Sequence, residues 1–102
     1  MIKIFKISGD SLYPLYKEGE FVVGIRLNVL VHVKSGDIVI FQHQSIGTMI
    51  KKIRTIQGSS VFVEGTTPQS LDSRVFGTIP LHTLTHKVLF KLPNVLVPAT
   101  HQ

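Results

Sequence analysis

Short runs of β-type residues, each followed by a turn signal, constrain the fold of this chain more than any other feature. The runs are rich in branched and aromatic side chains and lie at 2–7, 20–25, 29–33, 37–42 and 60–64. Glycine-containing segments that can reverse the chain lie at 17–19, 34–36, 57–59 and 65–68. Helical periodicity is nearly absent. The sequence therefore predicts a mainly β fold, a compact and mostly antiparallel β domain with little helix.

The length and composition favour one folded domain over residues 1–102. Apolar residues make up 43% of the chain and charged residues 17%, which excludes a disordered, highly charged tail. Cysteine is absent, so neither disulfides nor thiolate metal sites hold the fold together, and a reducing compartment fits. No apolar run is long enough to cross a bilayer. We expect a soluble, cytoplasmic protein, or a membrane-associated one if an anchor once preceded Met1.

The last segment of the chain, VLFKLPNVLVPATHQ, is apolar but cannot form an unbroken membrane helix. Lys91, Pro93 and Pro98 interrupt it. We expect a final strand followed by a loose tail.

The positive charge of the chain does not by itself predict a nucleic-acid site. The formal net charge is +5, from 11 basic and 6 acidic residues, which favours acidic partners in general. The only basic cluster is KKIR at 51–54, and no aromatic residues interleave with it as a base-stacking platform requires. Nucleic acid is therefore an unfavoured partner, whereas peripheral contact with a membrane surface stays open.

A serine at 8–14 and two lysines at 48–58 are the residues best suited to chemistry. In SGDSLYP, Gly9 and Pro14 flank Ser11 and favour a turn that exposes its hydroxyl at a strand end. In TMIKKIRTIQG, Lys51 and Lys52 lie in the apolar middle of a predicted strand. A lysine can activate a serine if burial lowers its pKa toward neutrality. Ordinary turn and edge positions would also explain each segment alone.

Strand alternation favours Lys51 over Lys52 as such a base. Successive side chains of a strand point to opposite faces. Lys51 shares its face with Met49 and Ile53, whereas Lys52 shares the wetter face with Thr48, Ile50 and Arg54. Only the apolar face with Met49 and Ile53 can exclude water from a lysine amine.

A third segment, at 65–80, places Ser70, Asp72 and Arg74 at alternate positions, which share one face if the segment is a strand. Asp72 and Arg74 could form a short ion pair that fixes a loop, and the hydroxyl of Ser70 could orient the lysine ammonium. A surface turn explains this segment equally well.

Taken in order, these segments resemble the motifs of the signal peptidase I family. They read GDSLYP at 9–14, GDIVIF at 36–41, IKKIRTIQGS at 50–59 and EGTTPQSLDSRVFGTIP at 64–80, and SLDSRVFG is the most discriminating. The resemblance spans most of the chain and implies the β fold of the signal peptidase and LexA-type catalytic domains. It departs from the family at Leu12, Leu15, Gln57, Ser59 and Gly65-Thr66, and it lacks the family's membrane anchor. The family's small soluble members include proteases proposed to mature nickel-type superoxide dismutase, our preferred narrower match.

The resemblance implies a serine endopeptidase that needs no cofactor and removes an N-terminal or signal-like segment from a precursor protein. Ser11 would be the nucleophile and Lys51 the general base, and the amides near Asp10 and Ser11 would bind the oxyanion. Ser70 would lie near the lysine, with Asp72 and Arg74 in support. The substrate would add as an extended strand beside 5–9 and 48–51, with small residues before the cut. The substrate-binding residues would be Phe5, Ile7, Gly9, Leu12 and Met49.

Other functions are weaker on the sequence alone. A catalytically silent or repressor-like β module that binds protein or DNA would not need both Ser11 and Lys51. A metal site is not predicted, because His82 and His86 would share a face only on a helix, and PLHTLTHK is rich in β-branched and turn residues. The remaining histidines are His32, His43 and His101.

Overall fold

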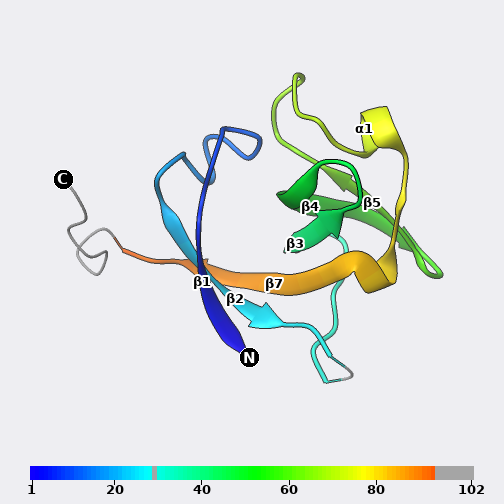
Figure 1. Ribbon diagram of the computed structural model, residues 1–102, viewed down its shortest axis with the longest axis horizontal. Coiled ribbons are helices and arrows are strands. Elements are labelled where there is room, and N and C mark those ends of the chain that lie inside the picture. The colour runs from blue at the N-terminus through cyan, green and yellow to red at the C-terminus, as the bar shows by residue number, and fades with distance from the viewer. Residues whose placement is uncertain (29, 94–102) are drawn as a thin grey trace.

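The computed structural model describes residues 1–28 and 30–93, and it confirms the predicted mainly β fold. Seven strands of this part of the chain form one antiparallel sheet in the order β1-β2-β7-β3-β4-β5-β6 (Figure 1). The strands are β1 (Ile2–Lys6), β2 (Phe21–Arg26), β3 (Ile38–His43), β4 (Gly47–Gln57), β5 (Ser60–Glu64), β6 (Ile79–Pro80) and β7 (Leu84–Lys91). Helix is limited to α1 (Ser73–Phe76) and the 3₁₀ turn η1 (Leu81–Thr83). Neither helical segment of the described residues has the length or apolar character to cross a membrane.

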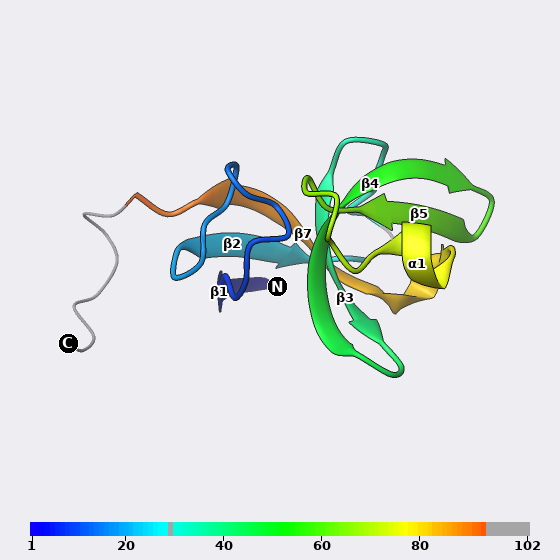
Figure 2. The same cartoon turned by 90° about the horizontal axis from the view of Figure 1, so that it is seen from above.

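Strand β7 joins the two halves of the sheet. It pairs with β2 through 86–91 and with β3 through 84–87. The half with β1 and β2 therefore lies on one side of β7, and the half with β3, β4, β5 and α1 lies on the other (Figure 2). The buried side chains form two clusters, and the smaller one spans both halves, because Ile40 belongs to β3. The larger cluster contains Val39, Phe41, Ile53, Val61, Val63, Ile79 and Leu84, and the smaller contains Ile7, Val22, Ile40 and Val88.

The strand expected at 29–33 is wrong, although Val29 itself lies outside the described residues. The segment after Asn28 forms a turn, because the Asn28 side-chain oxygen accepts hydrogen bonds from the N–H groups of Leu30 and Val31, at 2.7 and 3.2 Å. One isolated bridge, between Asn28 and Val31, is all that it adds to the β structure. The segment forms part of the connection from β2 to β3, which are not neighbours because β7 lies between them.

The final strand expected near the C-terminus is confirmed as β7. The tail expected after it, 94–102, lies outside the described residues, as does His101.

The pairing of β4 leaves part of one edge free. Strand β4 pairs with β3 from Gly47 to Lys52, but its pairing with β5 begins only at Lys52. In the described chain, the stretch 47–51 therefore has a strand neighbour on one side only. Its other edge borders the groove described next.

Candidate active site

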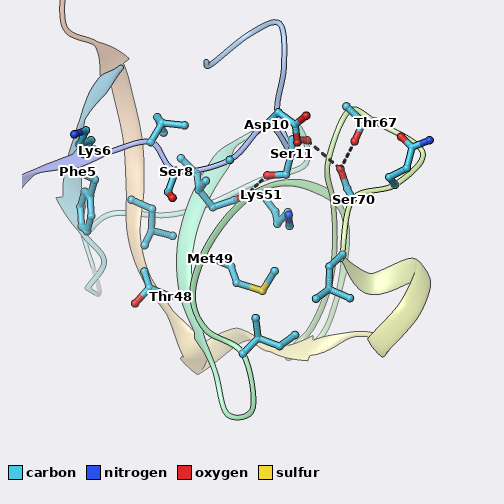
Figure 3. A pocket seen from close by; sticks show the side chains of 17 residues that line it. Phe5, Lys6, Ser8, Asp10, Ser11, Thr48, Met49, Lys51, Thr67 and Ser70 are labelled. Atoms are coloured by element: carbon cyan, nitrogen blue, oxygen red, sulfur yellow. Dashed lines mark hydrogen bonds between the residues drawn. The ribbon is translucent and has the colours of Figure 1, made fainter. Parts of the chain in front are cut away.

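A groove of about 540 Å³ opens between three segments that are distant in sequence (Figure 3). The first segment is the end of β1 with the residues after it, the second is the first half of β4 with the turn before it, and the third is the loop between β5 and α1. Its lining residues are 5–11, Ile40, Ile46, 48–51, Thr67 and 69–71. Ser11, Lys51 and Ser70 therefore line the same groove, as the close-up shows.

Ser11 begins the turn that follows β1. Gly9 has a φ of 84°, a conformation that favours glycine, and it reverses the chain just before the serine. The N–H of Tyr13 donates to the carbonyl of Asp10 at 3.0 Å and closes the turn. The hydroxyl of Ser11 donates to the carbonyl of Ile50 at 3.5 Å. The serine side chain is therefore aimed at the strand that carries Lys51.

Lys51 is buried, with only 4% of its surface exposed. It lies opposite Val39 of β3, and Ile53, two residues along β4, is fully buried. The burial predicted from strand alternation is thus confirmed, and Lys52 is half-buried on the other face. Burial lowers the pKa of Lys51, Asp72 opposes this change, and the positive charge of Arg74 adds to it. Within 1–28 and 30–93 the ammonium forms no ion pair.

Ser70 contacts the backbone of Ser11. Its hydroxyl donates to the carbonyl of Ser11 at 3.2 Å and shares a 2.8 Å hydrogen bond with the hydroxyl of Thr67. The N–H of Thr66 donates to the same carbonyl at 2.7 Å. Ser70 lies in the groove with Lys51, as expected from the resemblance, but its hydrogen bonds hold the turn of Ser11.

The ion pair expected between Asp72 and Arg74 is confirmed. The Arg74 guanidinium donates to both oxygens of the fully buried Asp72 carboxylate, at 2.7 to 3.2 Å. The same carboxylate accepts the N–H groups of Arg74 and Gly65, at 3.0 and 2.8 Å. Burial raises the pKa of Asp72, but the hydrogen bonds from Arg74 and Gly65 outweigh it and leave the pKa below its usual range.

Of the two conformations left open for the segment with Ser70, Asp72 and Arg74, the strand is wrong and the turn is found. Ser70 lies in a turn, Asp72 is the N-cap of α1, and Arg74 lies in that one-turn helix. An aspartate at an N-cap is favoured because its oxygen accepts a free helix N–H, here that of Arg74. Arg74 also donates to the carbonyl of Thr67 at 2.9 Å. The pair therefore closes the loop 65–72 at both of its ends.

Most of the residues expected around Ser11 line the groove. Asp10 is exposed in the groove lining, and within the described residues the backbone N–H groups of Asp10 and Ser11 donate to no backbone carbonyl. The expected substrate-binding residues Phe5, Ile7, Gly9 and Met49 also line the groove. Leu12 does not, because the turn directs its side chain inward, where it is 2% exposed.

Sequence reasoning missed the part that Gly65 and Thr66 play. A Cβ atom on Gly65 would clash with the hydroxyl of Ser70 and the carbonyl of Ser11, so only glycine fits there. The hydroxyl of Thr66 donates to the carbonyl of Tyr13 and lies 3.4 Å from that of Ser11. Bonds to backbone carbonyls depend on no particular partner side chain, and the only available signal was the glycine at the start of the loop.

Among residues 1–28 and 30–93, the charged and metal-ligating side chains form no second site of this kind. The KKIR cluster is divided, because Lys51 is buried while Arg54 pairs with Glu64 and lies over the Phe62 ring. In the part of the chain that the structure describes, no three potential ligands gather into a metal site. His86 is buried edge-on against Phe5, with ring centroids 4.9 Å apart.

The groove thus combines a hydroxyl, a desolvated amine and free backbone N–H groups, the components that an acyl-transfer site needs. Comparison of the sequence with protein-family models gives no match, and no curated protein matches it at a significant level. The functional assignment therefore depends on the motifs and on the geometry of these residues.

Proposed function

We propose that the protein is a serine endopeptidase with a Ser11/Lys51 dyad. The observation that carries the proposal is that Ser11 and Lys51 line one groove. The Ser11 hydroxyl donates a hydrogen bond to the carbonyl of Ile50, the residue before Lys51. A serine needs a base to become a nucleophile, and a lysine serves only where its ammonium form is disfavoured. Burial of Lys51 supplies that condition.

The chemistry follows from these groups. The neutral Lys51 amine accepts the hydroxyl proton while Ser11 Oγ forms a bond to the scissile carbonyl carbon. The resulting oxyanion is bound by backbone N–H groups near Asp10 and Ser11. The carbon–nitrogen bond then breaks, and the Lys51 ammonium gives its proton to the leaving amine. Water attacks the acyl ester with Lys51 again as base, which releases the acid and restores Ser11.

The substrate would bind as an extended strand beside the free edge of β4. Among residues 1–28 and 30–93, the stretch 47–51 has no second strand neighbour, and segment 5–11 lines the opposite wall of the groove. An added strand satisfies such free backbone groups, and alternate side chains then select the sequence. Phe5, Ile7 and Met49 supply apolar contacts. We propose a precursor protein with a removable N-terminal segment and small residues before the cut; nickel-type superoxide dismutase precursors are the narrower candidate.

The test is cleavage of a peptide mixture and of candidate precursors, followed by mass spectrometry. The wild-type protein and Ser45→Ala, a serine at the exposed tip between β3 and β4, should cleave at the same bonds. Ser11→Ala should not cleave, because it removes the nucleophile and little packing area. Equal turnover by Ser11→Ala would refute the dyad. If the wild-type protein and Ser11→Ala both bind the peptides and neither cleaves them, a silent peptide-binding module is favoured. DNA binding that weakens steeply with salt would favour a repressor-like module.

A further inference from the structure

We infer that Thr66 is a positioning residue for the nucleophile, an inference that rests on the proposed function. Thr66 contacts the turn of Ser11 at two points. Its N–H donates to the Ser11 carbonyl at 2.7 Å. Its hydroxyl has one proton, and the nearer of its two acceptors is the carbonyl of Tyr13 rather than that of Ser11. The backbone and side chain of one residue therefore hold two carbonyls of the same turn.

These two bonds determine where the reactive groups of Ser11 point. Within the described part of the chain, the Ser11 hydroxyl is held only by a long bond to Ile50, 3.5 Å, which is weak at that length. The orientation of its Oγ and of the neighbouring N–H groups must therefore come from the backbone of the turn. A small displacement of a nucleophile from its productive geometry costs a large factor in rate.

Thr66 itself is anchored from the other side. The preceding residue, Gly65, donates its N–H to Asp72, and the following residue, Thr67, accepts from Arg74 with its carbonyl. Thr66 thus lies between two fixed residues and cannot follow the turn if the turn moves. It is exposed, so its side chain contributes little to the core. A substitution of the Thr66 side chain should therefore change the position of the Ser11 turn without changing the packing of the core.

Thr66→Val and Thr66→Ser isolate the hydroxyl. Valine has nearly the same shape and leaves the backbone N–H in place, whereas serine restores the hydroxyl. Thr83→Val is the matched control, because the Thr83 hydroxyl also donates to a backbone carbonyl, that of Pro80 at 2.6 Å, away from the groove. Turnover, melting temperature and amide hydrogen exchange of Tyr13, whose N–H donates to Asp10, would be measured in each.

We expect Thr66→Val to lower kcat about tenfold, the worth of one hydrogen bond, with KM changed by less than about twofold. The Tyr13 amide should exchange about tenfold faster, because the turn opens more readily. Thr66→Ser should recover both values, and Thr83→Val should change neither. Tyr13 exchange in Thr66→Val equal to wild type would overturn the inference. A wild-type protein that cleaves nothing would instead refute the proposed function, since the exchange measurement does not need turnover.

Discussion

The hydroxyl of Ser11 donates a hydrogen bond to the carbonyl of Ile50, which directly precedes Lys51 in β4. The two residues are 39 positions apart, so the contact exists only in the folded sheet. The carbonyl of Ser11 is meanwhile held by the N–H of Thr66 and the hydroxyl of Ser70. The turn of Ser11 is thus attached to β4 on one side and to the loop 65–72 on the other.

The choice between the two adjacent lysines gives the first prediction. Lys51→Met should lose nearly all turnover, because it removes the buried amine that would accept the Ser11 proton. Lys52→Met should keep a substantial fraction, since Lys52 lies on the opposite face of β4 and does not line the groove. The measurement is cleavage rate with a peptide that the wild type cuts. An active Lys51→Met and an inactive Lys52→Met would show that the base is assigned to the wrong lysine.

Lys51 was predictable because its position depends on one local rule. Its neighbours on the same face, Met49 and Ile53, are apolar, so alternation alone placed the amine toward the core. The meeting of Lys51 with Ser11 was not derivable from spacing, because it depends on β7 lying between β2 and β3. Only the resemblance to a family joined the two segments in advance.

The incorrect predictions all concern residues in turns, where strand alternation does not apply. Leu12 was expected in the groove, but alternation gives no guidance inside a turn, and its side chain points to the core. The residues after Asn28 have strand propensity, yet the side chain of Asn28 captures the N–H groups that a strand would use. Asp72 and Arg74 were paired correctly from charge and proximity, but the sequence left both a strand and a turn open and did not predict the helix cap.

Activity should rise with pH through the pKa of Lys51. Burial, aided by Arg74 and opposed by Asp72, moves this pKa below the ordinary value of 10.5. If Lys51 is the base, as proposed, only its neutral amine accepts the Ser11 proton, so turnover increases as the ammonium loses its proton. A profile of kcat/KM against pH should show one ascending limb with a midpoint below 10.5. A rate that falls over the same range would contradict a lysine base.

The stability of the protein should depend on Lys51 over the same pH range. A lysine whose pKa is lowered by folding binds fewer protons in the folded state than in the unfolded state between the two pKa values. The free energy of unfolding therefore increases with pH between the folded pKa and about 10.4. Lys51→Met removes the buried charge, so it should be more stable than wild type at low pH, and the difference should shrink as pH rises. Urea midpoints of both proteins across pH provide the test, and a constant difference would oppose it.

Removing the charge of Asp72 should weaken stability and activity together. Asp72→Asn places an amide among donors from Gly65 and Arg74. Because the Arg74 side chain is 40% exposed, the loss of stability should be smaller than the ~3–5 kcal/mol of a fully buried pair. Glu64→Gln is the control, because its pair with Arg54 is partly exposed and 3.8 Å long, so it should cost little. Melting temperatures and turnover of both variants would be compared with wild type. Equal losses in the two variants would contradict a special role for Asp72.

The same carboxylate predicts an acid limit. Its folded pKa is lowered, so its stabilisation is present above the unfolded value of about 3.9 and is lost as pH falls through the folded pKa. Wild-type stability should therefore decline below about pH 4. The decline should be smaller in Asp72→Asn, measured by urea unfolding between about pH 2 and 6.

Gly65→Ala should disturb the nucleophile directly, because the space beside Gly65 is filled by two groups of the site. The new Cβ would clash with the hydroxyl and Cβ of Ser70 and with the carbonyl of Ser11. The clash with Ser70 involves a side chain, which a second substitution can remove. The clash with Ser11 involves a backbone carbonyl, which no substitution removes, so the backbone of Ser11 must shift. Overpacking of this kind costs about 1–3 kcal/mol. We therefore expect a lower melting temperature. At assay temperatures well below that melting temperature, turnover should fall by more than the unfolded fraction of the protein explains.

The double variant Gly65→Ala with Ser70→Gly separates the two clashes. Ser70→Gly alone removes one hydrogen bond to the Ser11 carbonyl and serves as the reference. If the remaining clash with that carbonyl displaces Ser11, the double variant should turn over more slowly than Ser70→Gly, even where their melting temperatures agree. The measurement is kcat for the four proteins at one temperature, with circular dichroism to confirm that each is folded. Equal kcat in the double variant and in Ser70→Gly would show that Ser70 alone transmits the effect, and that the carbonyl of Ser11 tolerates a side chain at position 65.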